Sequence, residues 1–94
     1  MAIHTRIKVE HGPDEARLTE LGVREWPIWT KETSSFPWSY EALETCYFLE
    51  GEVIVTPEGG KPVEMGKGDL VTFAAGLVCH WDVRQPVKKH YTFG

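Results

Sequence analysis

The sequence has only two cysteines, Cys46 and Cys79, and they are too far apart to form a CxxC motif. This spacing predicts reduced thiols rather than a disulfide framework or a structural zinc site. The longest apolar run, residues 73–79 with one glycine inside it, is far shorter than a membrane-spanning helix. The N-terminus also lacks the apolar segment of a signal peptide. Together these absences lead us to expect a cytoplasmic protein with no membrane partner.

Positive charge is also scarce. Ten Lys and Arg residues against fourteen Asp and Glu residues give a formal net charge of −4, and the basic residues are scattered along the chain. A protein that binds the phosphate backbone of a nucleic acid usually gathers positive charge on one face. We therefore do not expect nucleic acid as a partner.

A chain of 94 residues has room for one domain, which we expect to span residues 1–94. A domain of this size buries somewhat above ~60% of its unfolded surface, so its core has little margin of stability. A second copy would cover more apolar surface and the edge of a small sheet. The length therefore favours a homodimer.

Helical signals are confined to one segment. Residues 14–22 follow Pro13, begin with acidic residues, carry Leu18 and Leu21 three positions apart and end in Gly22, which predicts one short helix. Short β-rich runs separated by Gly or Pro follow it, at 24–31, 36–41, 44–50, 52–56, 62–65, 70–74, 77–83 and 87–93. Residues 58–60 contain two glycines and predict a hairpin turn. The pattern is typical of an all-β barrel or sandwich.

Alternation along two of these runs predicts which side chains share a face. In residues 44–50, Glu44, Cys46 and Phe48 lie on one face. In residues 77–83, Cys79 and Trp81 lie on one face, so the intervening residue His80 points the other way.

Two segments resemble the motifs of a known family. Residues 44–51 have the Glu-x6-Gly pattern of the first cupin motif, and residues 68–76 resemble the Gly-x5-Pro-x-Gly of the second, giving a motif core of about 36–83. The order Trp-Pro-Ile-Trp, Trp-x-Tyr, Glu-Thr-Cys-Tyr, Leu-Glu-Gly, Gly-Asp-Leu-Val-Thr-Phe and Lys-His-Tyr is similar to the small cupins grouped with the ureidoglycine aminohydrolase cupin domain. This resemblance covers residues 14–94. It implies a conical antiparallel β-barrel of the jelly-roll type, commonly paired as a dimer.

The chain departs from the metal site that the resemblance implies. Cupins usually take two histidines and a glutamate from the first motif and one histidine from the second. Here those histidine places fall on Trp38, Tyr40 and Cys79, and only Glu44 is retained. One carboxylate and one thiolate are too few for a four-coordinate zinc site, so we expect no metal and no other cofactor. The four histidines, His4, His11, His80 and His90, fall outside the ligand places. Of these, His90 is the best candidate for a functional role.

A pocket is expected in place of the metal site. Trp38, Tyr40, Cys79 and Trp81 would surround Glu44, with Phe48 on the same face as the carboxylate. Aromatic planes with one ionisable group suit a planar or ring-shaped ligand, whose N–H or O–H the carboxylate can accept. No cation can be assigned beside Glu44 from the sequence. The competing interpretation is that the aromatic side chains simply fill a narrow barrel.

Two functions remain open at this level. The first is a metal-independent cupin that binds a small molecule and could be an enzyme, with Glu44 as general acid or base and Cys79 as nucleophile or polar wall. The hydrolysis of amidines or ureides implied by the resemblance depends on metal ligands that this chain lacks, and it is not carried over. The alternative is a non-catalytic cupin dimer that senses a metabolite or contacts another protein. An open cavity above Glu44 favours the first function, and a barrel packed shut favours the second.

Overall fold

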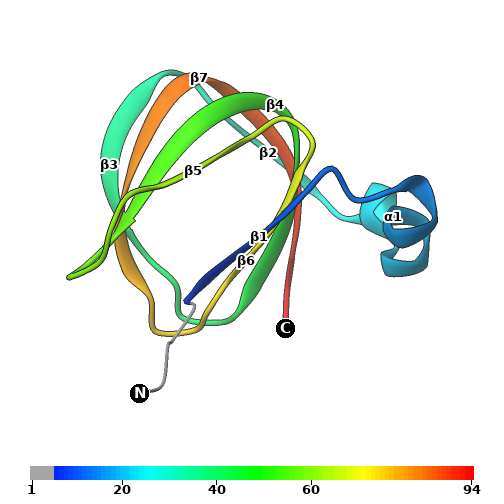
Figure 1. The fold of residues 1–94 in the computed structure, drawn as a ribbon, viewed down its shortest axis with the longest axis horizontal. Coiled ribbons are helices and arrows are strands. Elements are labelled where there is room, and N and C mark those ends of the chain that lie inside the picture. Colours follow the sequence, from blue (N-terminus) through cyan, green and yellow to red (C-terminus); the bar gives the residue numbers. More distant parts are fainter. Residues whose placement is uncertain (1–5) are drawn as a thin grey trace.

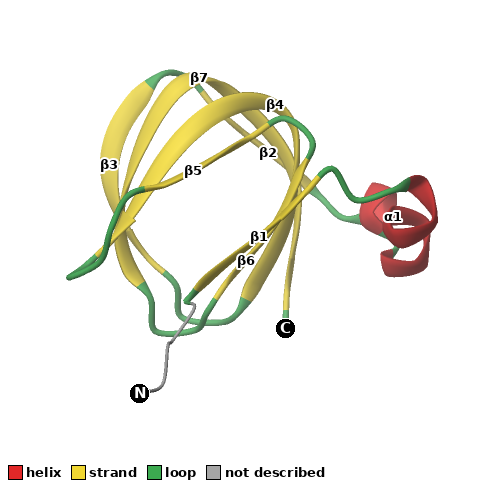
Figure 2. Cartoon of the chain, in the orientation of Figure 1, coloured by secondary structure: helices red, strands yellow, loops and turns green. Residues whose placement is uncertain are grey.

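The computed structural model describes residues 6–94, which form one antiparallel sheet with a short helix outside it (Figures 1 and 2). The strands are β1 (Ile7–His11), β2 (Ile28–Lys31), β3 (Ser34–Ser39), β4 (Glu44–Pro57), β5 (Val63–Gly66), β6 (Asp69–Phe73) and β7 (Val78–Phe93). The helix α1 (Glu15–Leu21) is followed by a 3-10 turn, η1 (Val23–Glu25). No helix in this part of the chain is long and apolar enough to cross a membrane. In Figure 1 the strands curve around a common interior, which agrees with the expected antiparallel barrel.

Two long strands organise the sheet, whose order is β1-β6-β4-β7-β2, with β3 paired to β7 and β5 paired to β4. Strands β4 and β7 run alongside each other from the pair Glu44 and Phe93 to the pair Pro57 and Cys79. One half of β7 also pairs with β3 and the other half pairs with β2. Strand β7 therefore lies between β4 on one side and β2 and β3 on the other. Inward-facing residues of these three strands come together on the inner face of β7.

The two long strands differ from the predicted pattern of shorter runs. β4 joins the predicted runs 44–50 and 52–56, and β7 joins 77–83 and 87–93. The register of β4 against β7 shifts between Phe48 and Val53, so this stretch is an irregularity inside a strand rather than a turn. Gly51 lies there with φ of +109°, a value that glycine adopts readily. The predicted break between the runs 44–50 and 52–56 was therefore wrong, because Gly51 lies inside β4.

The N-terminal elements both confirm and correct the predictions. The helix is confirmed: the Asp14 side chain caps it by accepting from the Arg17 backbone N–H at 2.9 Å, and Gly22 ends it with φ of +73°. The predicted strand 24–31 is shorter, because η1 occupies its start and β2 begins only at Ile28. Strand β1 was not predicted, and it forms by pairing with β6 from Ile7 to His11. His4 lies outside the described residues.

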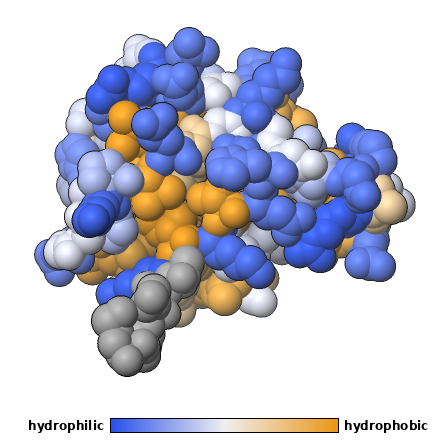
Figure 3. All heavy atoms as spheres, in the orientation of Figure 1, coloured by the Kyte–Doolittle hydropathy of each residue, from blue (hydrophilic) through white to orange (hydrophobic). Residues whose placement is uncertain are grey.

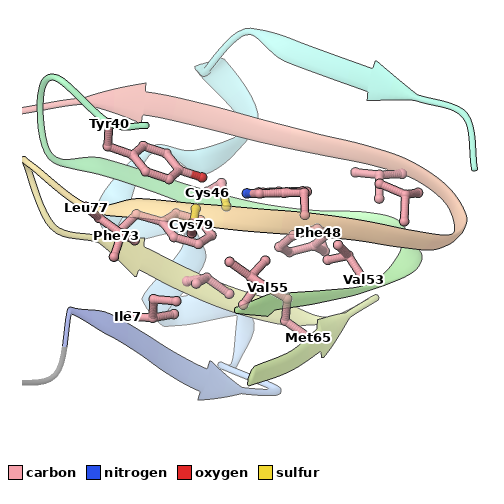
Figure 4. Packing of buried hydrophobic residues seen from close by; sticks show 14 residues of the cluster. Ile7, Tyr40, Cys46, Phe48, Val53, Val55, Met65, Phe73, Leu77 and Cys79 are labelled. Carbon is pink, nitrogen blue, oxygen red and sulfur yellow. The ribbon is translucent and has the colours of Figure 1, made fainter. Parts of the chain in front are cut away.

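The barrel interior holds one apolar core, part of which is drawn in Figure 4. Its buried members come from β1, β4, β5, β6, β7 and two loops and comprise Ile7, Tyr40, Cys46, Phe48, Val53, Val55, Met65, Val71, Phe73, Leu77, Cys79, Trp81, Val83 and Val87. In β4 and in the first part of β7 they alternate with more exposed residues, as a sheet with one face turned inward requires. Figure 3 shows further apolar surface between β5 and β1, which are not hydrogen-bonded to each other.

The close approach of β4 to β7 gives a test of the fold. In Gly51→Ala the new Cβ would lie 2.6 Å from the Pro86 carbonyl oxygen and 2.8 Å from the Val87 Cα, in addition to the strained φ. Overpacking and backbone strain together should lower the free energy of unfolding by about 2 kcal/mol or more in urea denaturation. The control is Gly59→Ala, where φ is also positive but nothing lies within 4 Å. Equal losses in the two variants would contradict the close-approach argument.

Candidate functional site

A cavity of about 200 Å³ lies against the inner face of β2, β3, β4 and β7. Its lining is Trp29, Phe36, Trp38, Tyr40, Glu44, Trp81, Lys89, Tyr91 and Phe93. All of these residues except Glu44 and Lys89 are aromatic. Apolar protein cavities of about 150 Å³ hold benzene, so this one has room for a small ring compound. The barrel is therefore not packed shut by its aromatic side chains.

The polar part of the lining is a buried ion pair. Lys89 Nζ donates to Glu44 Oε2 at 2.8 Å, and the two side chains are only 5% and 8% exposed. Glu44 begins β4, where it pairs with Phe93 of β7, and Lys89 pairs with Phe48 of β4 and Trp29 of β2. The long Lys89 side chain therefore extends along the inner face toward Glu44.

Aromatic faces surround the Lys89 ammonium group. Nζ lies 4.9 Å from the ring centroid of Trp81, 5.1 Å from Trp29, 5.7 Å from Phe73 and 5.9 Å from Phe48. Each ring presents a negative face to which a cation is attracted, and the attraction strengthens where water is excluded. The rings and the carboxylate together compensate the ammonium group for its lost hydration.

Lys89 corrects the expectation that no cation lies beside Glu44. The sequence contains a signal for it, because Val87, Lys89, Tyr91 and Phe93 are spaced by two and share a face that is otherwise apolar. The adjacent residue His90, which had seemed the better candidate, faces away from this cavity. Its Nδ1 lies 2.8 Å from the Trp26 carbonyl oxygen, so its contact serves the fold.

Tyr40 and Trp81 line the cavity, and each also carries a buried polar group. The Tyr40 ring stacks on Phe73 with centroids 4.7 Å apart, and in Figure 4 its hydroxyl points toward the interior. Within residues 6–94 neither Tyr40 Oη nor Trp81 Nε1 has a hydrogen-bond partner, and both atoms are enclosed by the protein rather than open to the cavity. Burial, with a further contribution from the Glu44 charge, raises the pKa of Tyr40, so its hydroxyl stays protonated.

Cys79 and Phe48 do not lie where the predicted pocket floor had them. Neither residue lines the cavity. Phe48 is fully buried beneath Lys89, and Cys79 Sγ contacts the Trp38 carbonyl oxygen at 3.6 Å. Burial raises the pKa of the Cys79 thiol, and it raises that of the Cys46 thiol to about 12. Both thiols are thus protonated near neutral pH, and the nucleophilic role of Cys79 stays a prediction.

The other predicted residues do come together. Trp38, Tyr40 and Trp81 line the cavity with Glu44, as the alternation of inward-facing positions indicates. Trp29 and Phe36 also line it and were not predicted. Trp81 contacts both of these rings, with centroids 5.8 Å from Trp29 and 6.0 Å from Phe36. Their strands, β2 and β3, become neighbours of the site only through pairing with β7.

The residues present do not fit the metal ion that many cupins hold. In the part of the chain that the structure describes, no three His, Cys, Asp or Glu side chains gather as metal ligands. The places of two histidines carry Trp38 and Tyr40, which are not ligands that a divalent ion would choose here. The one retained carboxylate, Glu44, already binds the Lys89 ammonium group.

Comparison with known proteins identifies the family. The model of the EutQ-like cupin domain matches residues 18–91. The chain belongs to the EutQ-like cupin domain family. The search of curated proteins gave no match. Family membership confirms the cupin expectation at this broad level and does not single out the ureidoglycine aminohydrolase group.

Solved structures agree with this cupin assignment. A DUF861 family protein from Thermotoga maritima is 53% identical with a TM-score of 0.91, covering 94% of this chain and 99% of that one. A DUF861 family protein of unknown function from Pseudomonas syringae is 25% identical, with a TM-score of 0.64 over 71% of this chain and 29% of that one. A putative ethanolamine utilization protein Q from Salmonella typhimurium is 24% identical, with a TM-score of 0.63 and coverage of 70% and 53%. This cupin thus spans about half of the Salmonella protein, and that likeness shows the fold alone.

The buried ion pair predicts a non-additive pair of substitutions. Lys89→Met leaves the Glu44 carboxylate buried without its cation, which should lower the free energy of unfolding by about 3 to 5 kcal/mol. The double variant Glu44→Gln with Lys89→Met removes both charges and should lie within about 1 kcal/mol of the parent protein. Urea denaturation of the two variants measures the difference. If the double variant loses as much as Lys89→Met alone, the loss comes from packing and not from the unpaired charge.

Proposed function

We propose that this cupin binds a small planar molecule in the aromatic cavity beside Glu44 and Lys89, without the help of a metal ion. The observation that carries the proposal is the open space of about 200 Å³ whose walls combine aromatic faces with a buried ion pair. Ligand sites are commonly apolar cavities with a few well-placed polar groups that fix orientation.

The exposure of the cavity rim supports binding over simple filling of the barrel. Trp38 and Phe93 line the cavity and yet are 47% and 61% exposed. They are on the inner face by register, because Trp38 pairs with the buried residue Cys79 and Phe93 pairs with the buried residue Glu44. A planar ligand would remove part of this aromatic surface from water, which is favourable.

A catalytic role for Glu44 is a further part of the proposal. Glu44 and Lys89 are 2.8 Å apart at the cavity wall and could accept and donate a proton at one bound group. Hydrolysis of an amidine or ureide through a metal is not proposed, because aromatic residues occupy two of the ligand places. Cys79 does not line the cavity, and we propose that it supports the cavity wall rather than acting as a nucleophile.

Ligand binding can be tested with a panel of monocyclic heterocycles. Titration followed by NMR of the indole N–H groups should show saturable shifts of Trp81 and Trp29. Trp38→Ala removes a rim ring and should weaken binding by about two- to tenfold, since an aromatic contact contributes about 0.5 to 1.5 kcal/mol beyond its area. Trp26→Ala is the matched control, because Trp26 is outside the cavity. An absence of saturable shifts with every compound would overturn the proposal.

We also propose that two copies of the chain form a homodimer. The dimer is part of the alternative function, that of a non-catalytic cupin dimer. Several large apolar side chains remain exposed, namely Ile28, Trp38, Leu43, Val78 and Phe93. Strands β1 and β5 each pair on one side only, and unpaired strand edges invite association. Light scattering should give twice the chain mass of 10.7 kDa. A mass of one chain at high micromolar concentration would remove this proposal.

A further inference from the structure

The ion pair uses only part of its hydrogen-bonding capacity. Glu44 Oε2 accepts from Lys89, while within residues 6–94 its other oxygen, Oε1, accepts no hydrogen bond. An ammonium group has three donors, and Lys89 uses one of them on Glu44. Both residues line the cavity. The cavity therefore presents an acceptor and a donor side by side.

The complement of this arrangement is a donor next to an acceptor on the ligand. We propose that the cavity takes a neutral heterocycle with a lactam edge, in which a ring N–H donates to Glu44 and the adjacent carbonyl accepts from Lys89. This inference rests on the proposed function and names its ligand class. Two neighbouring hydrogen bonds to charged groups would fix the ring in its own plane and be stronger than bonds between neutral groups.

The charge balance of the site favours a neutral ligand. Glu44 and Lys89 together carry no net charge, and they are surrounded by rings that exclude water. An anion would compete with Glu44 for Lys89 and leave a carboxylate without a partner. A cation would meet the Lys89 ammonium group. Either would bring an uncompensated charge into a desolvated space, which is costly.

The remaining lining fits a planar ring of this type. Trp29, Phe36 and Trp81 offer aromatic contacts near the ion pair, and the volume suits one six-membered ring with small substituents. The lactam edge would give a partner to Glu44 Oε1 and to one further donor of Lys89.

The test uses 2-pyridone, whose ring carries adjacent N–H and C=O groups. N-methyl-2-pyridone and 2-methoxypyridine are the matched probes that lack the N–H, and benzoate is the anionic probe. In NMR titrations of the indole N–H resonances, 2-pyridone should bind at least tenfold more tightly than any of the others. A site that hydrogen-bonds the N–H of its ligand rejects analogues without this N–H, because they leave the polar groups of the site unpaired.

The variants test whether the ion pair causes this preference. In the double variant Glu44→Met with Lys89→Met, which removes both charges and also the side-chain oxygen acceptor at position 44, the ratio of the affinities for 2-pyridone and N-methyl-2-pyridone should fall toward one, while ring binding persists. Trp26→Ala should keep the ratio of the parent protein. If Lys89→Met alone fails to fold, the double variant still decides, because it leaves no unpaired charge.

Each result bears on one of the two proposals. Equal binding of all neutral rings would overturn the lactam inference and leave the proposed planar-ligand function intact. Preferential binding of benzoate would overturn the charge-balance argument and with it the inference. Failure of every ring to bind would overturn the proposed function itself. A preference for 2-pyridone that survives in the double variant would show that Glu44 and Lys89 do not read the lactam edge.

Discussion

Burying a carboxylate charge inside a small barrel is costly unless the charge is compensated, and in this cupin Lys89 provides the compensation. The pair joins β4 to β7, the two strands that every other strand except β1 contacts through the sheet. Its geometry depends on the regular ladder between them, which runs without a shift from the pair Glu44 and Phe93 to the pair Phe48 and Lys89. The irregular stretch begins beyond that pair, where the backbone of Gly51 lies so close to Pro86 and Val87 that a side chain has no room. The ion pair thus belongs to the regular end of the two long strands.

The ion pair also changes what the cupin site can do. In the metal site that the cupin motifs imply, the glutamate would be one of several ligands, and a catalytic metal site keeps an open position for a substrate. Here the ammonium group takes up the carboxylate, and it is held by ring faces rather than by further oxygen or nitrogen ligands. Such a cation binds ligands by donating hydrogen bonds and not by accepting electron pairs from them. Recognition therefore depends on the pattern of donors and acceptors on the ligand.

Alternation within single strands predicted much of the site. It placed Trp81 inside the barrel, and the cupin motif marked Glu44, Trp38 and Tyr40, because these signals lie within one short stretch of sequence. Alternation marks the inward face of Lys89 but not its neighbours, since Lys89 reaches Glu44 through the pairing of β4 with β7, and Trp29 joins them through the pairing of β2 with β7. Turn signals were misleading where a glycine bends a strand instead of ending it, as at Gly51. Local sequence specifies faces, while register between distant strands is fixed by packing of the whole core.

Within residues 6–94 the hydroxyl of Tyr40 and the N–H of Trp81 are buried without a hydrogen bond, which lowers the stability of the folded chain. Replacing either group with an apolar one of similar shape would remove that loss. The rings of both residues line the cavity and are held rigidly, Tyr40 by stacking on Phe73 and Trp81 by the rings of Trp29, Phe36 and Phe48. A lining fixed in this way would need little reorganisation to receive the planar ligand proposed above, so its rigidity would lower the cost of binding.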